Sequence, residues 1–345
     1  MTDSPTPATP HRRRPRYSGK NPRRFEDKYK ERNPELYPET IAKVVASGKT
    51  PAGTHRPIMV AEILNVLKPQ PGEIAVDCTL GYGGHAREIL ARIQPGGRLI
   101  GLDVDPIELL KTEARLAGPG FVAHRSNFAG LPKILATEQL AGMDMILADL
   151  GVSSMQIDDP SRGFSVKFAG PLDMRMNPQR GQPASVLLER TAAGKLVELL
   201  VENTDEPRAE LLGAALAGKQ FATTRALAEA IRHALPGGVL DEEREDSIRR
   251  VFQALRIAVN EEFTALGTFL RNLPACLNAG GRVAILTFHS GEDRRVKKAF
   301  EAGLRDGVYE DIAREVIRPS PAERHDNPRS SSAKLRWAIK SARAI

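Results

Sequence analysis

Short apolar runs alternate with amphipathic helical patterns through the first half of the chain. Apolar side chains recur at three- and four-residue spacing over residues 57–68, which predicts a helix. A second helix is predicted over residues 106–116. The apolar runs predict buried strands at residues 73–78, 98–103, 121–124 and 144–149. Apolar strands that alternate with helices are typical of a parallel, doubly wound α/β sheet.

The alternation stops after the fourth of these strands. Residues 158–182 are rich in Gly, Pro and polar side chains and predict a long ordered loop. Strand patterns return at residues 281–288 and 334–339, and we expect the second at an edge of the sheet. Between the loop and these strands lie helical patterns, which cover residues 184–201, 205–217, 223–234 and 243–271. A helical segment therefore interrupts a single α/β domain.

These patterns divide the 345 residues into four parts. Residues 1–54 are expected to be a basic, disordered tail. The α/β core occupies residues 55–156 and resumes at residues 257–345. Residues 157–256 form the helical insert, which we expect to recognise the substrate.

All of the net positive charge lies at the start of the chain. Residues 1–56 hold 13 Lys and Arg against 6 Asp and Glu, whereas the remaining residues hold 37 of each. Tyr17, Phe25 and Tyr29 are interleaved with the basic residues, as in arms that bind nucleic acid. A solvated leader has the same composition, so both interpretations stay open.

Composition excludes several classes of protein. Two cysteines, Cys78 and Cys276, cannot form a disulfide scaffold, and the absence of a C-x-x-C pair argues against a zinc or iron–sulfur site. No apolar run reaches the ~20 residues of a membrane helix, and the first residues lack the apolar core of a secretory signal. We therefore expect a cytoplasmic protein with no membrane partner.

Polar chemistry gathers where the predicted strands end. In a doubly wound sheet, ligands bind at the carboxyl ends of the strands. Gly81, Gly83 and Gly84 follow the first strand and let the backbone approach a ligand closely. Asp103 ends the second strand, where a carboxylate can accept both hydroxyls of a ribose. Asp149 ends the fourth. Together they predict a cofactor that contains adenosine.

The glycine spacing favours one such cofactor over another. A dinucleotide loop has the pattern G-x-G-x-x-G, which seats a pyrophosphate on the helix that follows. This loop is G-x-G-G, and Arg87 stands where the last glycine would be. S-adenosylmethionine, which has an amino-acid tail and no phosphate, fits better than NAD. A nucleotide-dependent oxidoreductase and a non-catalytic RNA-binding assembly factor are the alternatives.

Longer motifs give the chain a close resemblance to the RsmH (MraW) family of 16S rRNA cytosine N4-methyltransferases. The basic segment before His55 lies outside this resemblance. The matching stretches run in order from residue 55 to residue 336: HRPIMVAEIL (55–64), VDCTLGYGGHAREIL (76–90), GLDVDP (101–106), ILADLGVSSMQIDDPSRGFSV (146–166), GPLDMRMNPQRGQ (170–182), FQALRIAVNEE (252–262), GGRVAILTFHSGEDRRVKKAF (280–300) and NPRSSSAKLR (327–336).

The resemblance implies a fold, a reaction and a set of ligands. The fold is that of class I S-adenosylmethionine-dependent methyltransferases, with an inserted all-helical domain. The reaction methylates the N4 amine of a cytidine in the decoding centre (P site) of the small subunit, so the partner is 16S rRNA or that subunit. No metal is implied, and a homodimer is left open. The implied cofactor contacts are Gly83, Gly84, His85, Asp103, Phe128, Asp149 and Gln156.

Two residues are candidates for a catalytic role. Asp149 could accept a hydrogen bond from the cytosine amine, and His289 in the F-H-S-G-E-D stretch is a second candidate. The target base must leave its stack, so unpaired or distorted RNA is expected. Basic residues of the long loop are candidate phosphate contacts, namely Arg162, Lys167, Arg175 and Arg180.

The chain departs from the family pattern at two motif positions. Tyr82 stands in the glycine loop where the family usually has Arg, and Gly291 stands where it usually has Leu. The helical insert also matches poorly at about 195–220 and 235–247. We expect these departures to affect RNA docking rather than cofactor binding.

Overall fold

The computed structural model describes residues 57–167 and 169–342, and the side chains of Ser154 and Met155 are not described. The predicted tail, residues 1–54, lies outside the described residues. None of the described helices is long and apolar enough to cross a membrane.

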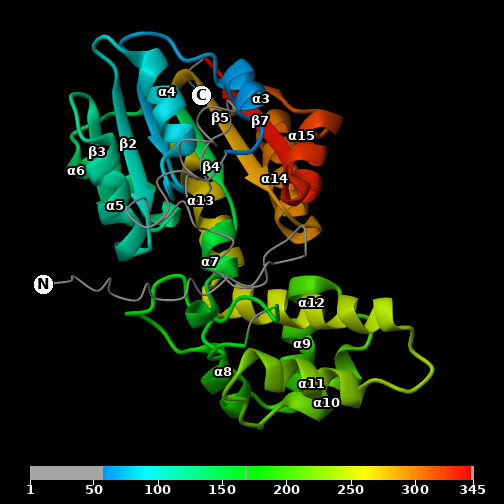
Figure 1. Cartoon of the computed structure of the whole chain (residues 1–345). Helices are drawn as coiled ribbons and strands as arrows, with labels where there is room; N and C mark the ends of the chain where they lie inside the picture. The colour runs from blue at the N-terminus through cyan, green and yellow to red at the C-terminus, as the bar shows by residue number, and fades with distance from the viewer. Residues whose placement is uncertain (1–56, 168, 343–345) are drawn as a thin grey trace, which may run out of the picture. The chain divides into compact units, whose positions relative to one another are not determined.

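Seven strands of the described chain form one sheet in the order β3-β2-β1-β4-β5-β7-β6 (Figure 1). The first five pair in parallel, whereas β7 runs antiparallel to both of its neighbours. Their bounds are β1 (Ile74–Asp77), β2 (Arg98–Asp103), β3 (Phe121–Arg125), β4 (Met143–Asp149), β5 (Leu277–Thr287), β6 (Tyr309–Ile312) and β7 (Lys334–Lys340).

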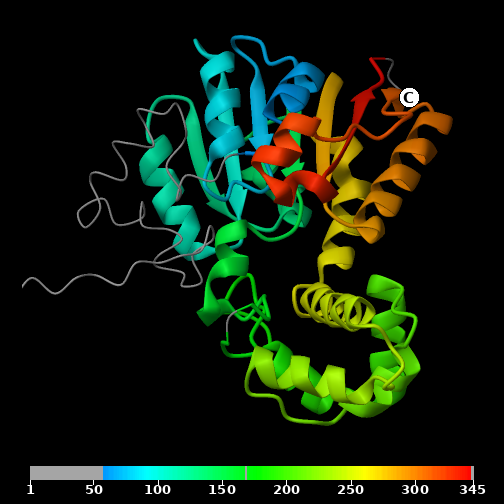
Figure 2. The same cartoon turned by 45° about the vertical axis from the view of Figure 1, so that its right-hand side comes forward.

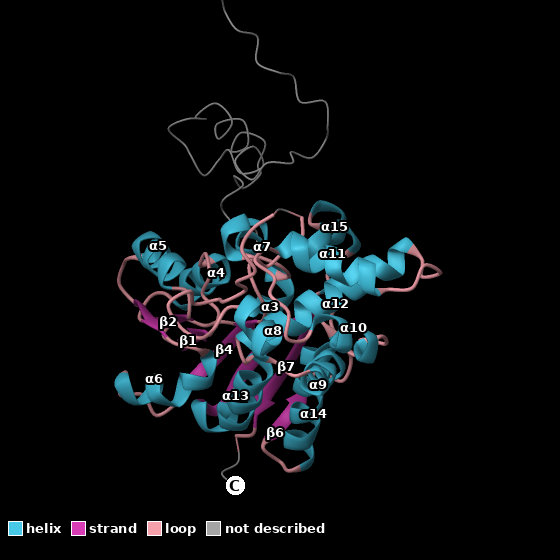
Figure 3. Ribbon diagram, turned by 90° about the horizontal axis from the view of Figure 1, so that it is seen from below, coloured by secondary structure: helices cyan, strands magenta, loops and turns pink. Residues whose placement is uncertain are grey.

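Helices cover both faces of the sheet. Figure 3 places α6, α13 and α14 on one side of the strands and α3, α4 and α5 on the other. Short helices lie in the loops, namely α7, α15, η2 and η4. The bounds are α3 (Val60–Leu67), α4 (Gly84–Ile93), α5 (Pro106–Leu116), η2 (Phe128–Gly130), α6 (Leu131–Thr137), α7 (Ser154–Asp158), α13 (Glu262–Cys276), α14 (Ser290–Arg305), α15 (Pro321–Asp326) and η4 (Pro328–Ser332).

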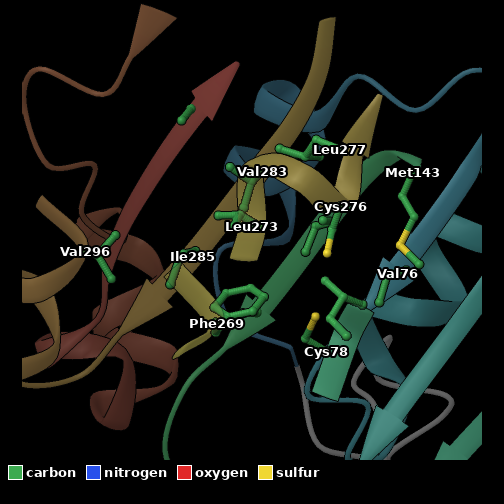
Figure 4. Packing of buried hydrophobic residues seen from close by; sticks show 14 of the residues in the cluster. Val76, Cys78, Met143, Phe269, Leu273, Cys276, Leu277, Val283, Ile285 and Val296 are labelled. Atoms are coloured by element: carbon green, nitrogen blue, oxygen red, sulfur yellow. The ribbon is translucent and has the colours of Figure 1, made fainter. Parts of the chain in front are cut away.

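Strand side chains alternate between the two faces, because successive residues of a strand point in opposite directions. Val76 and Ile285 belong to the cluster under α6, α13 and α14, whereas Ala75 and Ala284 belong to the cluster under α3 and α4. Figure 4 shows Phe269 of α13 packed among residues of the first cluster. Burial on both faces explains why these strands are apolar along their whole length.

The connection from β4 to β5 carries a separate hydrophobic core. Its buried members all lie between Leu172 and Leu255, and Figure 2 shows the helices concerned, in green and yellow, packed against one another. The helices are α8 (Ala184–Arg190), α9 (Ala193–Thr204), α10 (Ala209–Leu216), α11 (Thr224–Ala234) and α12 (Asp241–Val259), and a short turn, η3 (Pro160–Arg162), precedes them.

Three expectations about the elements are wrong. The strand predicted at residues 334–339 is β7, which is not at an edge, since β6 lies outside it. The single helix predicted over residues 243–271 is two helices, α12 and α13, separated at Asn260 and Glu261. The helix predicted over residues 184–201 is likewise divided, into α8 and α9.

The predicted bounds of the insert fall inside helices. The start at residue 157 lies within α7, and the end at residue 256 lies within α12, which continues to Val259. The division of the chain into core and insert stays a prediction at these bounds. The nearest break in the helical backbone is at Glu261, whose φ of 51° is in the left-handed region.

Candidate functional site

A cavity of about 940 Å³ opens at the carboxyl ends of β1, β2 and β4. This volume is near the upper end of the range for sites of small ligands. Of the predicted cofactor contacts, six line the cavity, namely Gly84, His85, Asp103, Phe128, Asp149 and Gln156. The topology therefore brings together residues that are far apart in the sequence, as the strand-end argument predicts.

Gly83, the remaining predicted contact, lies behind the wall as the residue before α4. Its φ is 72°, and a Cβ there would come within 2.7 Å of Thr112 and 2.8 Å of Leu116. Glycine is therefore required both by the backbone and by close packing against α5. The Thr112 hydroxyl donates to the Gly81 carbonyl at 2.5 Å, which fixes the loop to the same helix.

Asp103 is held by the backbone at the end of β2. One carboxylate oxygen accepts the Gly81 amide at 2.7 Å and the other accepts the Asp105 amide at 2.8 Å. Burial raises the pKa of Asp103 to about 6, and the two amides partly offset this. A carboxylate with a fixed orientation at the cavity wall is suited to accept the hydroxyls of a ribose.

Asp149 has an incomplete set of partners. Its Oδ2 lies 3.8 Å from His85 Nδ1, and its Oδ1 is buried with no hydrogen-bond partner among the described residues. Burial, followed by the charge of Glu292, raises the pKa of Asp149 to about 7. An unpaired buried carboxyl oxygen is costly. A ligand that brings positive charge or N–H groups would satisfy it.

His85 is bonded to the chain before α3. Its Nε2 lies 2.9 Å from the Ile58 carbonyl oxygen, which can only accept, so this nitrogen carries the proton. Burial lowers the pKa of His85, which favours the neutral ring. Asp77, buried beside it, has its pKa raised to about 6 by the same burial. Three carboxyl groups at neighbouring strand ends thus resist ionisation.

Phe128 and Gln156 close the cavity beyond Asp103. The Phe128 ring lies 5.4 Å from that of Phe269 and at 63° to it, so it has an edge contact with the core while its residue lines the cavity. The Gln156 side chain accepts the Ser153 amide at 2.9 Å and donates to Asp105 at 3.1 Å. These positions fit an adenosine-containing ligand, with Phe128 as the stacking surface.

A further part of the cavity wall contains residues that sequence reasoning missed. Arg256, Asn260 and Glu262 come from the α12–α13 junction and Glu292 comes from the first turn of α14. All lie within motifs of the family resemblance. No spacing rule identifies them, because only tertiary packing brings them to the same cavity as Asp149.

His289 contacts Glu292, which lines the cavity, and does not line the cavity itself. The His289 Nε2 lies 3.2 Å from Glu292 Oε1. Burial alone would raise the pKa of Glu292, but His289 and Arg256 hold it below its usual range. A catalytic role for His289 stays a prediction, and the geometry favours support of Glu292.

Glu262, His289 and Glu292 have donor atoms within 4.8 Å of one another, close enough to share a cation. However, Arg256 donates to both oxygens of Glu262 at 2.8 Å. Its guanidinium already supplies positive charge there and would repel a second cation. We therefore assign no metal ion to this cluster.

Two of the four candidate phosphate contacts have structural roles. Arg162 donates to Asp105 at 2.8 Å and to the carbonyls of Arg175 and Met176, and Arg175 forms a paired contact with Asp173. Their guanidinium groups are engaged within the protein. Lys167 and Arg180 are exposed and remain candidates for RNA contacts.

The order of the strands, the reversed β7 and the carboxylate-lined cavity define a class I S-adenosylmethionine-dependent methyltransferase. S-adenosyl-L-methionine is accordingly the cofactor. The orphaned Asp149 oxygen and the carboxylates around it fit this ligand, since its sulfonium and ammonium groups are both cationic. When bound, the cofactor supplies an electrophilic methyl group.

The chain belongs to the MraW methylase family, whose model matches residues 52–341. It is 48% identical to "Ribosomal RNA small subunit methyltransferase H 1" of Lachnoclostridium phytofermentans, over 96% of this chain and 93% of that protein. The protein of the same name from Agathobacter rectalis is 47% identical, over 96% and 98%. "Ribosomal RNA small subunit methyltransferase H" of Anaeromyxobacter sp. is 40% identical, over 82% and 96%. The family resemblance is confirmed.

The similarity also reaches into the basic N-terminal segment. Residues 1–54 make up about a sixth of the chain, so a coverage of 96% requires that most of them match the first two relatives. The expectation that this segment lies outside the resemblance is therefore wrong for these relatives. The Anaeromyxobacter protein, with a coverage of 82%, does not require such a match.

Cofactor affinity should depend on pH. We expect the affinity for S-adenosylmethionine to rise about tenfold between pH 6 and pH 8, because a cation binds more tightly once Asp149, with its pKa of about 7, has lost its proton. S-adenosylhomocysteine lacks the sulfonium charge and should show a smaller rise. Calorimetric titration of both ligands at each pH measures the difference. An equal rise in affinity for both ligands, or a fall in affinity, would contradict the assignment of Asp149 as a contact of the cofactor's sulfonium.

Loss of the Arg162 guanidinium should destabilise the protein. Arg162→Ala leaves Asp105, only 1% exposed, without its charged partner, and we expect the free energy of unfolding to fall by about 3 kcal/mol. Arg180→Ala, at an exposed position of the same loop, is the matched control and should change it by less than about 0.5 kcal/mol. Urea unfolding compares the two, and equal effects would count against a structural role for Arg162.

Proposed function

We propose that the protein methylates the exocyclic N4 amine of a cytidine in the decoding centre (P site) of 16S rRNA. One observation carries the proposal: Asp149, which has a buried oxygen with no hydrogen-bond partner among the described residues, lines the same cavity as the predicted cofactor contacts and as Glu262 and Glu292. An aromatic amine needs such acceptors. The names of the relatives, which specify the ribosomal RNA of the small subunit, support the choice of RNA.

The amine of cytosine is a weak nucleophile, because its lone pair is delocalised into the ring. Asp149, when ionised, accepts a hydrogen bond from one N–H of the amine and so concentrates the lone pair on nitrogen. As the N–C bond forms, the bond between the methyl group and sulfur breaks, its electron pair stays on sulfur, and S-adenosylhomocysteine is the leaving group. The N–H proton passes to the Asp149 carboxylate. The pKa of Asp149 is about 7 in the free protein. A bound cation lowers it, so the ionised form that accepts the hydrogen bond is the one present when the base arrives.

Alignment of the two reactants supplies the other contribution to catalysis. The Asp149 amide donates to the Thr79 hydroxyl at 2.6 Å, and the Thr79 amide donates to Asp77 at 3.1 Å. These bonds fix the ends of β4 and β1 relative to each other. Holding two reactants in line can lower a barrier by roughly 7–11 kcal/mol. The buried network therefore positions the acceptor rather than merely stabilising the fold.

The substrate is expected to present an unpaired base, since an amine inside a duplex cannot reach the cavity. Its source is the small ribosomal subunit in the cytoplasm. Binding of RNA by the basic segment, residues 1–54, stays a prediction that falls outside the described residues. The homodimer also stays a prediction, because nothing in the described chain tests it.

The test is methyl transfer to small subunits from cells that lack the endogenous enzyme, with the product nucleosides identified by mass. The expected product is N4-methylcytidine. Asp149→Asn should lower kcat at least about 100-fold, since the amide cannot take the proton. Asp306→Asn, at an exposed position after α14, is the control and should retain full activity. A different methylated nucleoside would contradict the proposed substrate, and full turnover by Asp149→Asn would contradict the proposed mechanism.

A further inference from the structure

The part of the cavity wall that comes from the α12–α13 junction is built around one ion pair. Arg256 Nε and Nη2 donate to the two oxygens of Glu262, each at 2.8 Å. Their side chains are 17% and 10% exposed, and both residues line the cavity. Neither residue belongs to the predicted cofactor contacts, so the pair is available for another ligand.

The turn between α12 and α13 holds this pair in place. The side-chain Nδ2 of Asn260 donates to the carbonyls of Met174 and Arg256. Its side-chain Oδ1 accepts the backbone amide of Met176 at 2.7 Å. Although burial acts against its charge, the Glu262 carboxylate raises the pKa of Arg256. Burial raises the pKa of Glu262, and the Arg256 guanidinium opposes this. The two hydrogen bonds orient the pair before any substrate arrives.

A paired guanidinium and carboxylate offer a donor beside an acceptor. The contact with Glu262 uses one hydrogen of Arg256 Nη2, so the second N–H of Nη2 is a donor next to the carboxylate, and each carboxylate oxygen keeps a second lone pair. The Watson–Crick edge of cytosine has the complementary pattern, with an amine donor next to the N3 acceptor. Uracil has the reverse pattern, with O4 next to N3–H. Adenine resembles cytosine in this respect.

We infer that the Arg256–Glu262 pair recognises the Watson–Crick edge of the target base, with Glu262 accepting one N–H of the amine and Arg256 donating to N3. Acidic side chains recognise cytosine through this amine. The inference rests on the proposed function and deepens it. It also gives each of the two N–H groups of the cytosine amine an acceptor, namely Glu262 and Asp149, which line the same cavity.

Glu292 and His289 lie beside this arrangement. Glu292 accepts the Phe288 amide at 3.0 Å and contacts His289, so its oxygens are already engaged. Both residues lie with Glu262 in one group whose donor atoms are within 4.8 Å. They therefore belong to the same polar cluster as the base-recognition pair, Arg256 and Glu262.

The test compares Glu262→Gln with Glu261→Gln, its exposed neighbour, as the matched control. Small subunits are reconstituted with cytidine or uridine at the modified position, and competition binding is measured with the full-length protein in S-adenosylhomocysteine. The wild type and the control should bind the cytidine form about tenfold more tightly. Glu262→Gln can donate to O4 of uridine, whereas Arg256 still faces N3–H, so its preference should fall from about tenfold to about threefold.

The outcomes separate the inference from the proposed function. A wild-type protein that forms no N4-methylcytidine contradicts the proposed function, whatever the variants do. A wild type that forms it, with Glu262→Gln retaining a preference for cytidine of about tenfold, overturns the inference alone. Loss of binding to both forms by Glu262→Gln, with the affinity for S-adenosylmethionine unchanged, also overturns it, since recognition predicts relaxed and not abolished binding.

Discussion

The crowding of carboxyl groups at the ends of β1, β2 and β4 is the constraint on which the rest of the site depends. Asp77, Asp103 and Asp149 all lie in surroundings that disfavour their charge, and burial raises their pKa values to about 6, 6 and 7. Parallel strands bring them together because their carboxyl ends meet at one edge of the sheet. The charge of a cationic ligand compensates the carboxylates for their lost hydration and offsets their mutual repulsion. The site is thus built for a ligand that carries positive charge.

Asp105 extends this arrangement from the cofactor side to the insert. Its side chain accepts the Ile107 amide at the start of α5, the Gln156 amide group and the Arg162 guanidinium. Arg162 in turn holds the carbonyls of Arg175 and Met176, and the Met176 amide binds Asn260 beside the base-recognition pair. One chain of hydrogen bonds therefore runs from the end of β2 to the α12–α13 junction. It makes the geometry of the substrate wall dependent on that of the cofactor wall.

The elements that the sequence predicts well are those buried on two faces. The strands β1, β2 and β4 have buried, apolar interiors, whereas β3 is an edge strand that ends in His124 and Arg125. The predicted bounds of all four differ from the observed ones by one residue or none. β6 was missed because its middle residues, Glu310 and Asp311, are exposed and interrupt the pattern. The break between α12 and α13 has no Gly or Pro to mark it, since it is held by the tertiary bonds of Asn260.

The same distinction applies to the site. Asp103 and Asp149 could be predicted because they end strands, and topology alone then places them at one edge. Arg256 and Glu262 lie more than 100 residues from Asp149 in the chain, in a helical pattern that looks continuous. Only the fold of the insert turns them toward the cavity. Their chemistry was visible in the sequence, but their position was not.

The most direct test of this account is the pKa of Asp149 itself, measured by carbon-13 NMR titration of its carboxyl group in the free protein and with S-adenosylmethionine bound. The account predicts a pKa of about 7 in the free protein and a clear fall on binding, because the cation stabilises the carboxylate. A pKa near the ordinary ~4 in the free protein, or no change on binding, would contradict it.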